Sequence, residues 1–202
     1  MKLKAIVEQI QHESKVVQGE ATKDKIYESH HTYPDESAAV EAFAKSVAKL
    51  LNVNEWSNLS GLSADFMLYD PVGRPKPAGP AEIGDFIQIN LPGPTPENWV
   101  QVIHRETGET RAEFTVQPCP DPLADNPNQI EHFFTEHARS IFRVDVSGCT
   151  ISAFEIGQQE SINNQQPQAE ERGLINTLIA EAGWLFYQKM QWKLLTDYLV
   201  HL

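Results

Sequence analysis

The stretch that decides the fold is GLINTLIAEAGWLFYQKMQWKLLTDYLVHL, which runs from Gly173 to Leu202. Its apolar side chains recur at steps of three, four or seven, a spacing that places them on one face of an α-helix. They include Leu174, Leu178, Ala182, Leu185, Trp192, Leu195, Leu199 and Leu202. A helix of this length measures about 45 Å, so its apolar face needs an extended partner. The pattern therefore predicts one long C-terminal helix packed against a β-sheet.

The chain before this helix is read as one shorter helix and a run of strands. Pro34 and Asp35 favour a helix start, and the apolar spacing continues it over residues 36–52. Alternating or β-prone segments predict strands near 24–32, 64–69, 83–91, 99–105, 111–117, 130–134, 138–146 and 150–156. Proline, glycine and amide side chains predict irregular segments at 70–80, 118–128 and 158–168.

This order of elements predicts an α+β fold with an antiparallel sheet, because the strands follow one another through short connections. The chain has 202 residues, of which 41% are hydrophobic, and no low-complexity linker divides it. We therefore expect a single domain over 1–202, in which 1–23 is an N-terminal extension and 24–202 forms the core.

Composition limits the partners that this chain can take. Sixteen basic and twenty-eight acidic side chains give a net charge of -12, which repels nucleic acids and anionic membranes. Neither a run of eighteen apolar residues nor a signal sequence is seen, so we expect a cytoplasmic protein without membrane insertion. Cys119 and Cys149 are expected to be free thiols, with Cys119 exposed between two prolines. No nucleotide-binding loop or nucleophile motif occurs, and we expect no cofactor.

The chain resembles the START-like helix-grip superfamily, which includes lipid- and small-ligand-binding proteins and polyketide cyclase-like proteins. The resemblance lies in the strand before Tyr33-Pro34, the helix ending at Trp56, the start of a strand at Pro80 to Asp85, the strand Trp99 to Arg105 and the terminal helix. It covers most of residues 24–202. It implies a curved antiparallel sheet of about six or seven strands gripping the C-terminal helix, with a ligand cavity between them.

Such a cavity would be lined by inward-facing side chains of the sheet and the last helix. The candidates are Phe114, Val116, Phe142, Val144, Phe154, Ala182, Trp184, Phe186 and Met190. The same side chains would equally serve as core packing, and a slip of one residue would exchange the two faces of a strand.

Two polar candidates accompany them. Asp85 interrupts an apolar strand face and lies either at the sheet edge or in the pocket, the edge being favoured by the cost of burying a carboxylate. His132 belongs to the cluster Glu131 to His137, whose spacing suits neither a helical nor a strand metal site, so we expect no metal.

Three functions remain open. The resemblance implies a protein that binds a small hydrophobic or aromatic ligand. A polyketide cyclase or dehydratase-like enzyme on the same fold is the second, with a pocket His or Asp as acid or base. The third is a protein–protein interaction module with a solid core and an acidic surface. Ligand, catalysis and oligomeric state are not decided by these residues.

Overall fold

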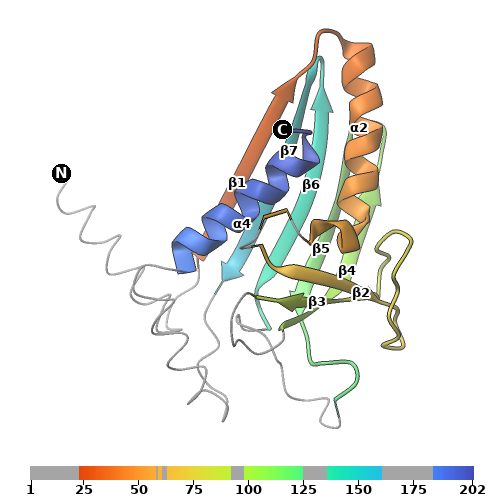
Figure 1. Cartoon of the computed structure of the whole chain (residues 1–202), viewed down its shortest axis with the longest axis vertical. Coiled ribbons are helices and arrows are strands. Elements are labelled where there is room, and N and C mark those ends of the chain that lie inside the picture. Colours follow the sequence, from red (N-terminus) through yellow and green to blue (C-terminus); the bar gives the residue numbers. More distant parts are fainter. Residues whose placement is uncertain (1–22, 58, 61–62, 92–97, 125–135, 161–183) are drawn as a thin grey trace, which may run out of the picture.

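The computed structural model of the chain describes residues 23–57, 59–60, 63–91, 98–124, 136–160 and 184–202. Its elements follow one another in the order that the sequence predicts (Figure 1). They are β1 (Lys23–Thr32), α2 (Glu36–Leu51), the 3-10 helix η1 (Val53–Trp56), β2 (Asp65–Tyr69), β3 (Phe86–Asn90), β4 (Asn98–Thr107), β5 (Arg111–Pro118), β6 (Arg139–Ser147), β7 (Thr150–Glu160) and α4 (Trp184–Leu199).

The described strands form one antiparallel sheet of seven strands in the order β1-β7-β6-β5-β4-β3-β2. Strands β2 to β7 are neighbours in both sequence and space. β1, the first described strand in the sequence, pairs with β7, the last. The predicted α+β class with an antiparallel sheet is confirmed.

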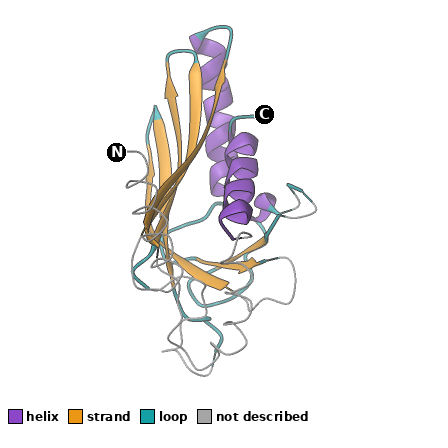
Figure 2. Ribbon diagram, turned by 90° about the vertical axis from the view of Figure 1, so that its left-hand side faces the viewer, coloured by secondary structure: helices purple, strands orange, loops and turns teal. Residues whose placement is uncertain are grey.

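Both long helices lie on one face of this sheet (Figure 2). α2 packs on β6 and β7, and α4 packs on β1 and β7 and also meets α2. We call the side of the sheet that they cover the helix-covered face. A C-terminal helix held against the sheet confirms the expected helix-grip arrangement. The expected helical residues 173–183 lie outside the described part of the chain.

The start of α2 follows from two residues. Asp35 caps the helix, since its Oδ1 accepts a hydrogen bond from the Ala38 amide at 2.8 Å. Pro34 precedes this cap, and its ring disfavours the helical conformation for Tyr33, the residue before it, so the helix does not extend further back. The helix then runs to Leu51, which agrees with the predicted span of 36–52.

An aromatic cluster fills the space between η1 and the sheet. Trp56 is fully buried, and its ring lies 4.8 Å from that of Phe142, 5.5 Å from that of Phe66 and 5.7 Å from that of Phe114, measured between centroids. Its Nε1 donates a hydrogen bond to the Lys49 carbonyl at 3.0 Å, so burial leaves no polar atom of the indole without a partner. Trp192 of α4 joins the cluster through Phe142, at 5.5 Å.

Two strand boundaries differ by three residues or more from those predicted. β3 starts at Phe86 instead of residue 83, because Gly84 takes a φ of +94° that belongs to a turn and leaves Ile83 59% exposed before the strand. β7 continues to Glu160, where a loop was expected from residue 158, because pairing with β1 extends to Lys23 and Glu160. The predicted strand 130–134 lies outside the described residues.

The residues that follow α4 are held against α2 by hydrogen bonds. α4 ends in a Schellman motif: the Leu202 amide donates to the Asp197 carbonyl at 2.9 Å, and His201 occupies the left-handed position with φ 65°. His201 Nε2 lies 3.1 Å from both the Ala42 carbonyl and Ser46 Oγ. The neutral imidazole therefore ties the end of α4 to α2.

This anchor is expected to weaken in acid. Burial lowers the pKa of His201, the hydrogen bond to Ala42 opposes that shift, and the charges of Lys49 and Lys45 add to it. A folded-state pKa below the unfolded one gives a stabilisation that is present above about pH 6.5 and lost as the pH falls through the folded value. Urea unfolding at about pH 7.5 and about pH 5 should show a larger loss for the parent than for His201→Asn, since asparagine accepts the left-handed conformation without titrating. Equal losses would contradict this role for His201.

Candidate functional site

The candidate site lies where α4 crosses the helix-covered face of β1, β7 and β6. Cross-strand register aligns Tyr27, Glu155, Phe142 and Phe114 in one row across four strands. Residues that pair directly across an antiparallel sheet project from the same face, so this row faces the helices. It is aromatic except for one carboxylate.

That carboxylate, Glu155, has an exposed fraction of 0%. Ile151 and Ala153 are also fully buried and precede it at intervals of two, so the alternation of β7 places Glu155 on the helix-covered face. A carboxylate in such a place requires polar or charged neighbours, because its transfer from water is costly. The sequence analysis did not identify Glu155 as a candidate, although its place in the alternation Ile151, Ala153, Glu155 indicated an inward-facing side chain.

α4 adds two buried hydrogen-bond donors, one of which, Trp192, contacts the aromatic row. Gln191 is 2% exposed, and its Oε1 accepts from the Ala64 amide at 2.9 Å. Its Nε2 is buried without an acceptor among the described residues, and the same holds for Trp192 Nε1. The Trp192 ring meets Phe142 edge to face. We call Phe142, Glu155, Gln191 and Trp192 the sub-helix site.

Four of the predicted lining residues are buried on the helix-covered face, namely Phe114, Val116, Phe142 and Val144. The rings of Phe114 and Phe142 are 5.3 Å apart and both pack on Trp56. This part of the interior is thus occupied by side chains. Phe142 also reaches α4, and it is the residue that joins the packed cluster to the sub-helix site.

The prediction for Phe154 is corrected by the strand register. Phe154 pairs with Arg143 and Glu28, which places it on the face opposite to Phe142. The alternation of β7 is shifted by one residue from the one assumed, because Glu155 takes the inward position. Met190 is half-buried on α4. Ala182 and the side chains of Trp184 and Phe186 lie outside the described part of the molecule.

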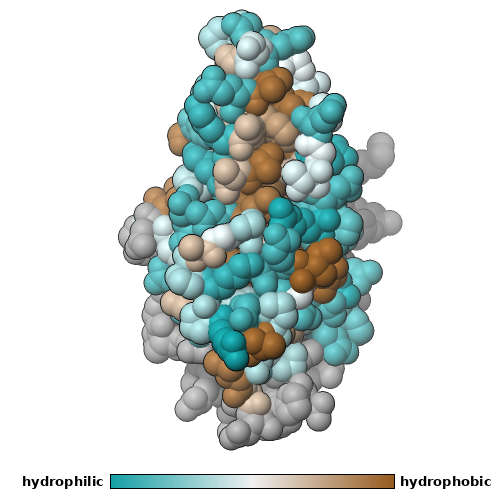
Figure 3. Space-filling model, turned by 90° about the vertical axis from the view of Figure 1, so that its right-hand side faces the viewer, coloured by the Kyte–Doolittle hydropathy of each residue, from teal (hydrophilic) through white to brown (hydrophobic). Residues whose placement is uncertain are grey.

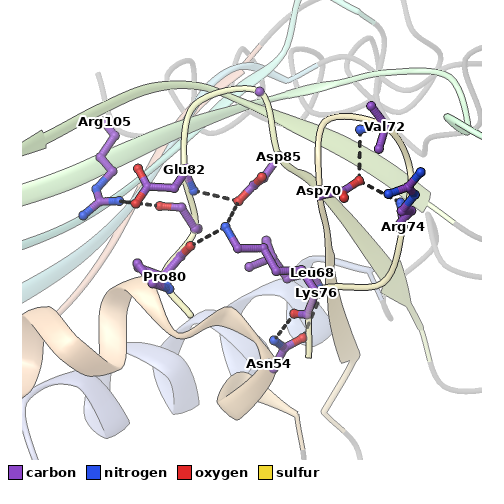
Figure 4. A network of polar contacts seen from close by, with 12 residues as sticks. Asn54, Leu68, Asp70, Val72, Arg74, Lys76, Pro80, Glu82, Asp85 and Arg105 are labelled. Carbon is purple, nitrogen blue, oxygen red and sulfur yellow. Dashed lines mark hydrogen bonds and ion pairs between the residues drawn. The ribbon is translucent and has the colours of Figure 1, made fainter. Parts of the chain in front are cut away.

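Asp85 is held in a polar network at the start of β3 (Figure 4). Its exposed fraction is 1%, and its Oδ2 accepts from Lys76 Nζ at 2.7 Å and from the Glu82 amide at 2.9 Å. Lys76 Nζ also donates to the Pro80 carbonyl, and Arg105 pairs with Glu82 at 2.6 Å. Asp85 therefore ties the loop 70–85 to the sheet through Lys76.

The remaining sequence candidates are spread over the surface or lie outside the described residues. His132 is among the latter, and Glu136 and His137 are exposed, with 3.9 Å between the nearest atoms of their side chains. Cys119 is buried, so the expectation of an exposed thiol was wrong; burial raises its pKa to about 12. Both cysteines are free thiols, as expected.

The hydropathy of the described surface does not point to a further binding site. The face that carries α2 shows apolar side chains in separate areas divided by polar ones (Figure 3). Within the described residues, no helix has the length and apolar character needed to cross a membrane.

Comparisons with known proteins find similar structures at low sequence identity. No protein-family model and no curated protein matches the sequence. A hypothetical protein of Helicobacter pylori matches the structure with a TM-score of 0.50 and 13% identity, over 92% of each chain. A major latex-like protein of Panax ginseng matches with a TM-score of 0.41 and 10% identity, over 78% of this chain and 95% of that one.

A point mutant of norcoclaurine synthase from Thalictrum flavum, in complex with a transition-state analogue, also matches in structure. Its TM-score is 0.40 at 10% identity, over 90% of this chain and 97% of that one. The predicted helix-grip fold is confirmed by the antiparallel sheet and the helix packed on it.

Proposed function

We propose that this protein binds a small hydrophobic or aromatic ligand between α4 and the helix-covered face, at the sub-helix site. The observation that carries the proposal is the pair of buried donors on α4, Gln191 Nε2 and Trp192 Nε1, neither of which has an acceptor among the described residues; the Trp192 ring contacts Phe142. An unpaired buried donor costs about 1–3 kcal/mol, which a ligand oxygen would offset. Apolar walls with a few polar groups are the usual composition of small-molecule sites.

The ligand class follows from these groups. Aromatic side chains favour a flat or apolar ligand body, and two donors on adjacent residues of α4 favour an acceptor, such as a carbonyl or ether oxygen, at one end. A fully charged anion is a poorer fit, because Glu155 is buried on the strand next to Phe142. The preferred ligand is a neutral aromatic compound with an acceptor oxygen.

A matched pair of ligands tests this proposal. 2-Acetonaphthone carries a carbonyl acceptor and 2-ethylnaphthalene does not, while their apolar bodies are alike. Both should quench tryptophan fluorescence saturably, with the ketone in the micromolar range, about -8 kcal/mol. Trp192→Phe and Gln191→Leu should each weaken the ketone about tenfold and leave the hydrocarbon nearly unchanged, because each removes one donor and keeps an apolar side chain.

Trp99→Phe is the control, since Trp99 Nε1 is also buried without an acceptor among the described residues but lies in a different cluster with Tyr69 and Cys119. It should not alter ketone binding. Absence of saturable binding would reject the proposal and favour the protein–protein interaction module. That function needs a solid core, and the rings packed around Trp56 are consistent with one.

A cyclase or dehydratase-like enzyme is the second candidate, and Glu155 is the observation that favours it. Such a reaction needs a general acid or base beside a bound apolar substrate, and a carboxylate enclosed in an apolar site can serve as either. Glu155 is fully buried and pairs across the strands with Phe142, so it is the carboxylate we propose for this role. Ligand binding is common to both candidates and is therefore the property to establish first.

A further inference from the structure

Three metal-ligating side chains meet on the opposite face of the sheet from the helices. One ligand atom each of His104, Glu106 and Glu113 lies within 4.8 Å of the others. His104 and Glu106 come from β4, and Glu113 comes from β5. The group is separate from the sub-helix site, because the sheet lies between them.

A β-bulge in β4 brings the three together. The register shifts between Val102 and His104, so that Val102 pairs with Val116 whereas His104 pairs with Thr115. The extra residue reverses the alternation of β4, which turns His104 and Glu106 to the outer face. Glu106 pairs directly with Glu113, and directly paired residues share a face. The hairpin thus gathers residues from both of its strands.

The ligand atoms of this trio are available. His104 and Glu106 are both exposed, so their ligand atoms are open to solvent. Arg143 Nε donates to Glu113 Oε2 at 2.6 Å, which orients that carboxylate and leaves Oε1 without a hydrogen bond in the described structure. Ligating carboxylates are commonly oriented by such an outer partner.

Charge also favours a cation here. Two carboxylates directly opposite each other repel, and Arg143 compensates only Glu113. The other nearby arginine, Arg111, is engaged mainly by Asp145 through two hydrogen bonds, and it interacts more weakly with the charges of Glu113 and Glu106. A divalent ion between Glu106 and Glu113 would relieve the repulsion.

We propose that His104, Glu106 and Glu113 bind a divalent transition-metal ion of the zinc class. An imidazole nitrogen favours such ions over magnesium or calcium, and the two carboxylate oxygens complete three protein ligands. Three ligands leave a coordination position for water or for a group from another molecule. The site is a surface zinc site with an open position.

Zinc titration of the full chain by calorimetry tests the proposal. The parent should bind with micromolar affinity at a site that His104→Ala weakens at least tenfold, and Glu106→Gln should have a similar effect, because each removes one of three ligands. Magnesium should give no comparable binding. All substituted side chains are exposed, and circular dichroism verifies that the variants are folded.

His137→Ala is the matched control, since His137 is an exposed histidine beside Glu136 but away from the hairpin trio. It should bind zinc as the parent does. Absence of zinc binding, zinc binding that survives in His104→Ala, or binding that is lost in His137→Ala would each overturn the proposal. The readout is independent of any ligand at the sub-helix site.

Discussion

Replacement of Trp56 by alanine is expected to lower the free energy of unfolding by about 3–5 kcal/mol, the range for removal of a large buried aromatic side chain. Trp56 is fully buried and contacts three aromatic rings from β2, β5 and β6. Its loss would open a cavity between η1 and the sheet and also leave the Lys49 carbonyl without its donor. Because domains are stable by only about 5–15 kcal/mol, this loss is a large part of the total.

Urea unfolding measures this effect against two controls. Trp56→Phe keeps a ring in the cluster and should lose less than the alanine variant. Val40→Ala changes a residue of α2 that is 57% exposed and should stay within about 0.5 kcal/mol of the parent. A Trp56→Ala variant within about 1 kcal/mol of the parent would show that the cluster is not the centre of the core.

The parts of the fold that the sequence predicted are those set by local periodicity. The helix at Glu36–Leu51 is marked by Pro34, Asp35 and its apolar spacing, and the hairpin of β4 and β5 by alternation around Gly108. Each signal is contained within about fifteen residues, which is the span over which periodicity is informative. The resemblance to helix-grip proteins added the expectation that the sheet grips the C-terminal helix, and the described elements confirm it.

The candidate sites were less predictable, because they depend on which residues of each strand face the helices. A shift of one residue exchanges the faces of a strand, so Phe154 was placed inward and Glu155 was overlooked. The bulge in β4 has the same effect at His104 and Glu106. The partner of Glu106 is fixed by hairpin register, and the neighbours of Gln191 come from a segment more than a hundred residues away. A periodicity read over about fifteen residues predicts neither the bulge that sets the first pairing nor the contact across the long sequence separation of the second.

The environment of Asp85 was likewise not predictable from the local sequence pattern, and its replacement is the second change for which we expect a large loss of stability. Its position in an apolar pattern suggested an edge or a pocket, whereas the structure supplies a partner from the preceding loop, Lys76 at 2.7 Å. The side chain of Asp85 is 2% exposed and that of Lys76 is 24% exposed, so the pair is largely removed from water. Its carboxylate also holds the Glu82 amide.

Asp85→Ala is therefore expected to lower the free energy of unfolding by about 3 kcal/mol, the lower end of the range for breaking a buried ion pair, because Lys76 keeps partial access to solvent. Limited proteolysis should then cut within 70–85, since the loop loses its tie to β3. The surface pair Glu41–Lys45, with side chains 73% and 64% exposed, is the matched control. Glu41→Ala should cost less than about 1 kcal/mol.

The double variant Lys76→Met with Asp85→Ala separates the ion pair from the backbone contact. If the penalty comes from an ammonium left without its partner, removing both charges should recover part of the lost stability. If it comes from the Glu82 amide, the double variant should be no more stable than Asp85→Ala, because that amide stays unpaired. Equal, small losses for Asp85→Ala and Glu41→Ala would contradict the role of Asp85 as the buried tie of this loop.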